Sequence, residues 1–424
     1  MQRIISISKY LILIWVCGLS AIKSAAQQSA TFLQTLKTVE VKVNGEWGEP
    51  PVMTKGNGDY VEISFDDLQH NYVRYIYRIT HCDANWEKSD IYEGDYLKGM
   101  NGAYRLENYS QSVTPEMEYN HYTLRLPNED NQLLLSGNYK VEFFEDGDDE
   151  PVAVACFSIL EPKVSVDINV SGNTDIDTYA SHQQVEFTVN YKNYANVSSP
   201  ETEFYPVVVQ NHRWDTHVSD IKPTYIKNNE LIYNFNKKLI FEGGNEYRRF
   251  EILNRLVPTM NIEKMYLDKG YYHAVVYEDK PRTNYLYDQD QDGRYLIRNN
   301  DNIDNDTESD YFYTHFTLKT PKLPGGEVYL NGDLTDNSFD LYYQMDYNII
   351  DHQYEIVLPL KQGSYNYQYV LVGDDDEKGS TQLTEGNFYR TENEYYVYIY
   401  HRPFGDRYDR LVGFQKHTFN SNGN

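Results

Sequence analysis

The feature that most constrains the fold is a series of short runs in which apolar and polar residues alternate. Residues 60–65 (YVEISF) and 139–144 (YKVEFF) are two of these runs. Turn residues separate them, as at 136–138 (SGN) and 146–148 (DGD). Alternation over four to eight residues between such turns predicts β-strands with one buried face. The chain also has 42 Tyr against 17 Phe and 4 Trp, and tyrosine favours half-buried sheet faces. We therefore predict an all-β protein.

The chain length and the positions of proline and glycine residues predict three tandem β-sandwich, immunoglobulin-like domains. A chain of 424 residues is about three domains long. Pro162 interrupts strand pairing just before a new alternating run, which sets the first domain at 27–162. Residues 320–326 (TPKLPGG) read as a linker, so we expect a second domain at 163–320 and a third at 321–424. Residues 90–101 predict a short helical turn.

The strand predicted at 395–401 has large side chains on both faces. Alternation assigns these side chains to two sets: Tyr396, Tyr398 and Tyr400 on one face, and Tyr395, Val397 and Ile399 on the other. Such a strand is either covered on both faces or carries a tyrosine-lined surface.

The N-terminus predicts a secretory signal peptide, residues 1–26. Arg3 and Lys9 precede an apolar run at 10–22, and the small residues 24–26 follow it. The run is too short for a comfortable membrane span, so we expect a soluble, exported protein. Cys17 lacks the small preceding residue of a lipidation site, which makes cleavage after Ala26 the better interpretation.

The charge balance argues against one class of partner. The formal charge is −26, and removing the three basic residues of the leader lowers it to −29. This excess of negative charge repels phosphate backbones and argues against nucleic-acid binding. It is compatible with a basic partner surface, and equally with a role in solubility alone.

Two cysteines follow the leader, Cys82 and Cys156, both in the predicted first domain. An oxidising compartment permits a disulfide between them, provided that their Cα atoms lie within about 7 Å. Two separate buried thiols are the alternative.

One acidic segment resembles the start of a calcium loop. Asp288, Asp290 and Asp292 alternate and are followed by Gly293, which is the spacing of hard oxygen ligands around Ca²⁺. Position twelve of the loop is Asn299 rather than the bidentate Glu that the full pattern has. The segment therefore predicts either a calcium site or a solvated acidic turn.

Catalytic signatures are missing from the sequence. It contains neither a GxSxG elbow nor an HExxH motif. His212 and His217 are interpreted as ordinary sheet or loop residues, and residues 243–246 (GGNE) as a turn. We therefore predict a protein that is not an enzyme and, calcium aside, has no cofactor.

The last third of the chain resembles the immunoglobulin-like modules that accompany starch- and glycogen-active proteins. The resemblance lies in residues 328–334 (VYLNGDL) and 363–369 (GSYNYQY). Such modules bind sugars through exposed aromatic side chains, and Asn337 stands where they usually have Trp. The resemblance therefore implies the fold more strongly than it implies sugar binding.

An ordered series of segments resembles the type IX secretion plug proteins of the Bacteroidota over nearly the whole mature chain. The segments are 81–86 (HCDANW), 95–99 (DYLKG), 119–122 (YNHY), 126–128 (LPN), 136–139 (SGNY), 210–215 (QNHRWD), 241–250 (FEGGNEYRRF), 290–295 (DQDGRY), 360–363 (LKQG), 385–388 (EGNF) and 407–413 (RYDRLVG).

This resemblance implies a periplasmic protein that docks on a giant outer-membrane barrel, the type IX translocon, and closes its lumen when no cargo is bound. Within the segments, Asp83, Trp86, Asn138 and Asn245 are expected to cap turns or anchor corners, and none is assigned to the partner interface. A periplasmic or surface glycan-binding protein is the alternative function.

Overall fold

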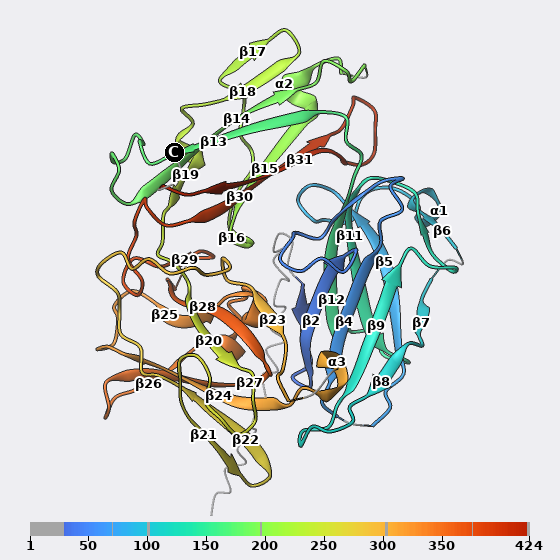
Figure 1. Cartoon of the computed structure of the whole chain (residues 1–424). Coiled ribbons are helices and arrows are strands. Elements are labelled where there is room, and N and C mark those ends of the chain that lie inside the picture. Colours follow the sequence, from blue (N-terminus) through green and yellow to red (C-terminus); the bar gives the residue numbers. More distant parts are fainter. Residues whose placement is uncertain are drawn as a thin grey trace, which may run out of the picture.

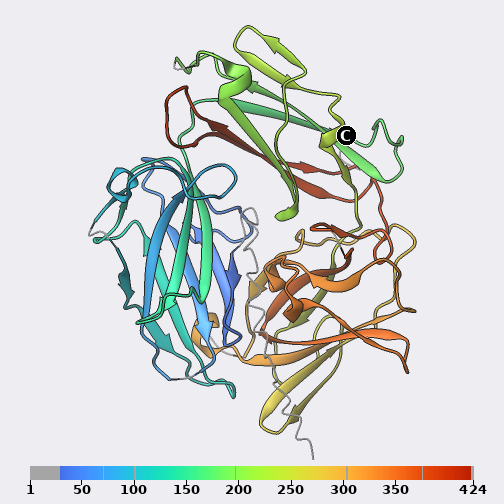
Figure 2. The same ribbon diagram turned by 180° about the vertical axis from the view of Figure 1, so that it is seen from behind.

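Regular structure in this protein is almost entirely β, and it is arranged in three bodies (Figure 1, and from behind in Figure 2). The computed structural model describes residues 29–421 except 70, 100–101, 196, 302–303 and 375. The predicted signal peptide lies outside the described residues. The prediction of an all-β protein is confirmed.

The first domain consists of two main sheets that enclose one hydrophobic core. One sheet contains, in spatial order, β1 (Ala30–Thr31), β12 (Ala153–Leu160), β11 (Gly137–Glu145), β5 (Tyr75–Cys82) and β7 (Tyr104–Leu106), with β3 (Val52–Thr54) beside β12. The other contains β2 (Leu36–Val43), β4 (Val61–Asp67), β9 (Asn120–Leu126) and β8 (Tyr109–Gln111). The expected helical turn is α1 (Glu93–Tyr96), which leads into the small ribbon of β6 (Leu97–Lys98) and β10 (Gln132–Leu133).

Tyrosines form much of this core. Phe65 of β4 packs against the rings of Tyr75 and Tyr122, each 5.4 Å away between centroids, and these two rings also contact each other edge-on at 4.9 Å. Both tyrosines are fully buried, and their hydroxyls donate to the Asp67 carboxylate and to the Val73 carbonyl. Buried phenols are tolerated because each hydroxyl finds an acceptor.

The second domain is built from two separate stretches of chain. One sheet orders β13 (Ser165–Ser171), β14 (His182–Asn190), β18 (Glu230–Tyr233) and β17 (Tyr225–Lys227), with β19 (Ile240–Glu242) also on β14. The other orders β16 (Arg213–Val218), β15 (Phe204–Gln210), β30 (Asn393–His401) and β31 (Arg410–Phe419). The short helices α2 (Pro200–Glu203) and η1 (Lys237–Leu239) lie in its loops.

The third domain is inserted between β19 and β30. One set of paired strands comprises β20 (Arg248–Ile252), β23 (Tyr295–Ile297), β25 (Glu327–Asn331), β28 (Gly363–Val372) and β29 (Gly379–Ser380). The facing sheet orders β21 (Ile262–Asp268), β22 (Tyr271–Val276), β24 (Tyr311–Lys319), β27 (Gln353–Lys361) and β26 (Asp346–Asn348). Its helices are α3 (Asn305–Glu308), η2 (Asp333–Thr335) and η3 (Leu341–Tyr343).

Strand pairing contradicts the domain boundary expected at 320/321. β24, which precedes it, pairs along its whole length with β27, which follows it. β15 pairs with β30 from Phe204↔His401 to Gln210↔Tyr395, so the C-terminal strands belong to the second domain. The segment 320–326 crosses from one sheet of the third domain to the other. Proline and glycine residues mark a change in chain direction. The chain changes direction where it crosses between two sheets of one domain, just as it does in a linker between domains, so this segment resembles a linker in sequence.

The two-faced strand β30 is covered on both sides. Tyr395, Val397 and Ile399 pack in the core of the second domain. The opposite face packs in a cluster that includes Val52 and Leu160 of the first domain. Every residue of β30 is buried, so it joins two domains and does not form a tyrosine-lined surface.

Candidate functional site: a cavity between the three domains

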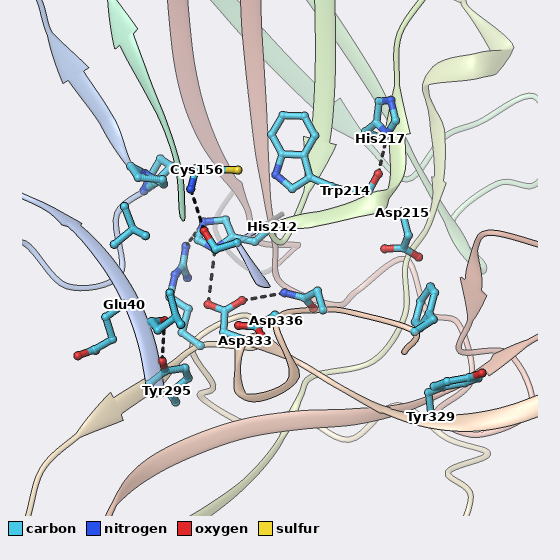
Figure 3. Close-up of a pocket in the computed structure, with 18 of the residues that line it drawn as sticks. Glu40, Cys156, His212, Trp214, Asp215, His217, Tyr295, Tyr329, Asp333 and Asp336 are labelled. Atoms are coloured by element: carbon cyan, nitrogen blue, oxygen red, sulfur yellow. Dashed lines mark hydrogen bonds and ion pairs between the residues drawn. The ribbon is translucent and has the colours of Figure 1, made fainter. Parts of the chain in front are cut away.

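A cavity of about 830 Å³ lies where the three domains meet (Figure 3). The first domain contributes β2 and the loop at 46–51, and the second contributes the start of β16. The third contributes Tyr295, the 327–339 region and the loop after β28. Its volume is within the usual range of ligand clefts. The cavity exists only when the three domains are packed together, because each domain forms part of its wall.

A buried arginine connects the second and third domains at the cavity wall. The Arg294 guanidinium donates to the Glu394 carboxylate at 2.5 Å and to the Tyr396 hydroxyl at 2.6 Å. Burial would raise the pKa of Glu394, but Arg294 outweighs burial and lowers this pKa to about 2. The carboxylate therefore stays ionised at neutral pH.

Aromatic side chains form a second part of the wall. Trp47 of the first domain donates through Nε1 to the Tyr295 carbonyl of the third domain at 2.7 Å. Trp214 packs edge-on against Trp86, with ring centroids 6.0 Å apart, and against Tyr398 at 5.6 Å. Trp47, Trp214 and Tyr398 give the cavity apolar surface beside its charged groups, and Trp86 packs behind Trp214.

Carboxylates dominate the third-domain side of the cavity, where Asp333 and Asp336 are labelled in Figure 3. Burial, together with the nearby Asp333, raises the pKa of Asp336 to about 7. The His212 Nδ1 lies 3.7 Å from the Asp333 carboxylate. The His217 Nδ1 lies 2.6 Å from the Trp214 carbonyl. Both histidines line the cavity.

Two of the segments that resemble the plug family meet at this cavity. Residues 210–215 provide His212, Trp214 and Asp215, and residues 290–295 provide Arg294 and Tyr295. Sequence reasoning named both segments without placing them together. It assigned neither Trp47 nor Asp333 to a functional site: Trp47 lies in none of the named segments, and Asp333 lies in 328–334, which was named only for its resemblance to sugar-binding modules.

Two of the three aspartates of the acidic segment, Asp288 and Asp290, are engaged by protein groups, whereas one carboxylate oxygen of the buried Asp292 has no hydrogen-bond partner in the described part of the chain. Asp288 pairs with Arg249, with Nη2 and Oδ1 2.5 Å apart. Asp290 accepts the backbone N–H groups of Tyr247 and Asp292. Burial raises the pKa of Asp290 to about 7, and burial and Asp290 raise the pKa of Asp292 well above its ordinary value. Among the described residues, no group of three or more His, Cys, Asp or Glu side chains is arranged to hold a metal ion. Calcium binding at this loop stays a prediction.

Cys82 and Cys156 are buried thiols. They lie on β5 and β12, and β11 runs between these strands, pairing Asn138 with Cys82 and Lys140 with Cys156. Strands two positions apart in a sheet are separated by roughly 9–10 Å, which exceeds the reach of a disulfide.

Two polar residues of the plug-like segments join the first and second domains. Asp83 forms an ion pair with Arg402 at 2.7 Å and accepts the backbone N–H of Asp409 at 3.1 Å. The Asn138 carboxamide oxygen accepts from Ser158 at 2.8 Å and from Tyr400 at 2.9 Å. Their expected role as anchors is therefore present in the structure, at a joint between domains.

Asn245 and Trp86 also hold turns in place. Asn245 donates to the Glu385 carbonyl at 2.9 Å and accepts the N–H of Glu246 at 3.1 Å. Trp86 is 1% exposed and has a φ of 62°, so its position in the turn after β5 is set by packing. At the position where sugar-binding modules carry Trp, Asn337 donates to Asp333 at 2.8 Å. Its side chain supports the turn after β25.

Comparison with known proteins supports the resemblance. Residues 36–161 match the family described as type 9 secretion system plug protein 1st domain. A crystal structure of a hypothetical protein from Parabacteroides merdae is 42% identical, with a TM-score of 0.90 over 93% of this chain and all of that one. No curated protein matches the chain significantly.

Two other solved structures match with little similarity. They are C-terminal domains of antigen I/II proteins, BspA from Streptococcus agalactiae and AspA from Streptococcus pyogenes. Identities are 9% and 8%, coverage is 90% of this chain and 98% and 99% of theirs, and both TM-scores are 0.15. Scores this low do not indicate a shared fold. The Parabacteroides structure shows that this chain shares its fold with that protein over nearly its whole length. The family model covers residues 36–161, and the first domain of this chain belongs to the type IX secretion system plug protein family.

Proposed function

We propose that this protein is a non-enzymatic plug that docks on the periplasmic side of the type IX outer-membrane barrel and closes its pore when no cargo is bound. The observation that carries the proposal is the match of residues 36–161 to the plug family. The predicted leader supports export to the periplasm. In the part of the chain that the structure describes, no helix is long and apolar enough to cross a membrane.

The connections between the domains suit a stopper. The buried pair of Arg294 and Glu394 joins the second and third domains, and Asn138 and Tyr400 join the first and second. Such contacts favour one arrangement of the domains, because moving one domain relative to another breaks these hydrogen bonds and ion pairs. A rigid body presents a constant surface to a pore, and specific interfaces bury on the order of 1,200–2,000 Å² in total.

The proposal is tested by the permeability of cells that lack this protein but keep the barrel. We expect a deletion strain to become sensitive to a large antibiotic such as vancomycin, and a strain that lacks both the protein and the barrel to regain resistance. The double deletion is the control, because it shows whether the leak passes through the barrel. Unchanged sensitivity in the single deletion, with the barrel verified in the membrane, would contradict the proposal.

A pull-down tests the partner directly. Tagged protein extracted in a mild detergent is expected to retain the giant barrel in stoichiometric amount, identified by mass spectrometry. Loss of the barrel under conditions that keep it intact, together with retardation in glucan affinity electrophoresis, would favour the glycan-binding alternative.

A further inference from the structure

The cavity between the three domains has an excess of negative charge. Ten of its lining residues are Asp or Glu, and two, Lys42 and Arg294, are basic. Three cations just outside the lining neutralise part of this negative charge. Arg213 pairs with Asp215, Lys322 with Glu327, and Lys416 with Glu49.

Two further charged groups enter the count of acidic and basic side chains around the cavity. Lys37 interacts with the buried Asp336, and Glu394 takes up the charge of Arg294. With these groups included, eleven carboxyl groups face six basic groups, an excess of five, although Asp336, with a pKa of about 7, is partly protonated at neutral pH. A cavity with low-dielectric walls concentrates the field of such an excess.

Aromatic surface lies beside these carboxylates. Trp47 is 37% exposed, whereas Tyr329 is 8% exposed, and both line the cavity together with Phe339 and Trp214. A guanidinium ion stacks on aromatic faces and bonds carboxylates in a planar fork, which an ammonium ion does less well. Acidic and aromatic groups in one cleft therefore suit an arginine side chain.

We propose that this cavity is the docking site for an arginine-bearing extended segment of the partner barrel. The proposal rests on the proposed plug function for the identity of the partner, and on the cavity itself for the chemistry of the segment. Occupation by one segment would contact all three domains at once, because each contributes a wall. Binding would thus depend on the arrangement of the domains.

The first experiment measures peptide binding to the full mature protein by fluorescence anisotropy. The probe is a capped, dye-labelled peptide of glycine and serine with two arginines, and its control has citrulline, a neutral isostere, at both positions. We expect the arginine peptide to bind, to weaken as salt is raised, and to bind at least about tenfold more tightly than the citrulline peptide. Equal binding of the two peptides, or no binding at low salt, would overturn the proposal.

Matched variants separate the cavity from the overall charge. The triple change Glu46→Gln, Asp374→Asn and Asp376→Asn neutralises carboxylates that line the cavity. The control, Asp175→Asn, Glu201→Gln and Asp220→Asn, removes the same charge from exposed positions of the second domain. We expect about tenfold weaker peptide binding in the cavity variant and a change under about twofold in the control. Equal losses of peptide affinity in both variants would mean that the overall negative charge of the protein attracts the peptide. That result would overturn the proposal that the cavity is the docking site.

The barrel pull-down with the same variants distinguishes the two proposals. Reduced capture of the barrel by the cavity variant but not by the control supports the docking site. Undiminished capture by the cavity variant overturns the docking site while leaving the plug function intact. Absence of the barrel even with the unaltered protein overturns the plug function itself.

Discussion

Lys361 of the third domain and Asp66 of the first domain form an ion pair at 2.7 Å in which both side chains are only 1% exposed. The Lys361 ammonium also lies 4.3 Å from the centre of the Tyr119 ring. The Asp66 carboxylate accepts from Tyr311 at 2.6 Å, and His121 lies 2.7 Å from its other oxygen. This network closes the contact between the first and third domains and keeps a buried charge on each side compensated.

Removing the lysine should therefore be costly. Lys361→Met leaves Asp66 charged, buried and without its cation, and we expect a loss of about 3–5 kcal/mol in the free energy of unfolding measured by urea denaturation. Lys322→Met is the control, because Lys322 pairs with Glu327 at the surface and its loss should cost less than about 1 kcal/mol. Similar losses for both variants would contradict the role of the buried pair.

The same network predicts a pH dependence. Burial lowers the pKa of His121, but the bond to Asp66 outweighs burial and raises this pKa above its ordinary value of 6.5. A raised pKa in the folded state stabilises the protein below pH 6.5, and this contribution is lost as the pH rises through the folded-state pKa.

We expect the stability difference between the unaltered protein and His121→Gln to shrink between pH 6 and pH 8. Thermal unfolding of the two proteins across this range measures the difference. Burial would also raise the pKa of Asp66, yet Lys361 and His121 hold it below 3.8, so the carboxylate stays ionised throughout the range. A difference that grows with pH would contradict the assignment.

The joint between the first and second domains can be tested through Tyr400. Tyr400→Phe removes one donor from the Asn138 oxygen, which keeps its bond from Ser158, so we expect a loss of about 1 kcal/mol. Asn138→Ala leaves the Asp83 carbonyl and two hydroxyls without this partner, and we expect about 2–4 kcal/mol. Urea denaturation measures both. The reverse order of the two losses would be inconsistent with Asn138 as the centre of the joint.

The two thiols should be inert in the folded protein. Burial raises the pKa of Cys82 to about 12, and a protonated, inaccessible thiol reacts slowly. We expect a thiol reagent such as DTNB to label Cys82 and Cys156 only after denaturation, and a reducing agent to leave the melting temperature unchanged. Destabilisation by the reducing agent would reveal a disulfide and contradict the strand register.

A calcium ion at the acidic loop would have to displace Arg249 from Asp288 and to ionise Asp290, whose pKa is raised to about 7. Calcium binding would therefore release protons and strengthen between pH 6 and pH 8. Calorimetry with millimolar calcium at both pH values checks this, with Asp288→Asn as the variant that weakens a genuine site. Absence of heat at pH 8 would remove the calcium prediction and leave an acidic turn.

The alternation of apolar and polar residues was enough to predict the strands, because this pattern is local. Residues 60–65, 139–144 and 395–401 all lie in or overlap strands close to their predicted limits. Family-like segments such as 81–86 and 136–139 also identified residues that hold turns and joints. Strands and turns could therefore be predicted, because both depend on residues that are neighbours in the chain.

Which strands share a sheet depends on contacts between residues that are far apart in the chain. β30 lies far beyond the proline- and glycine-rich segment 320–326, yet it pairs with β15, because its two apolar faces need cover from two domains. The cavity has the same origin, since Trp47, Trp214 and Asp333 come together only through the insertion of the third domain into the second. The pairing of Lys361 with Asp66 spans 295 positions, and the sequence shows only two ordinary charged residues. Local patterns specify strands and turns, whereas long-range burial of charge and apolar surface selects their partners.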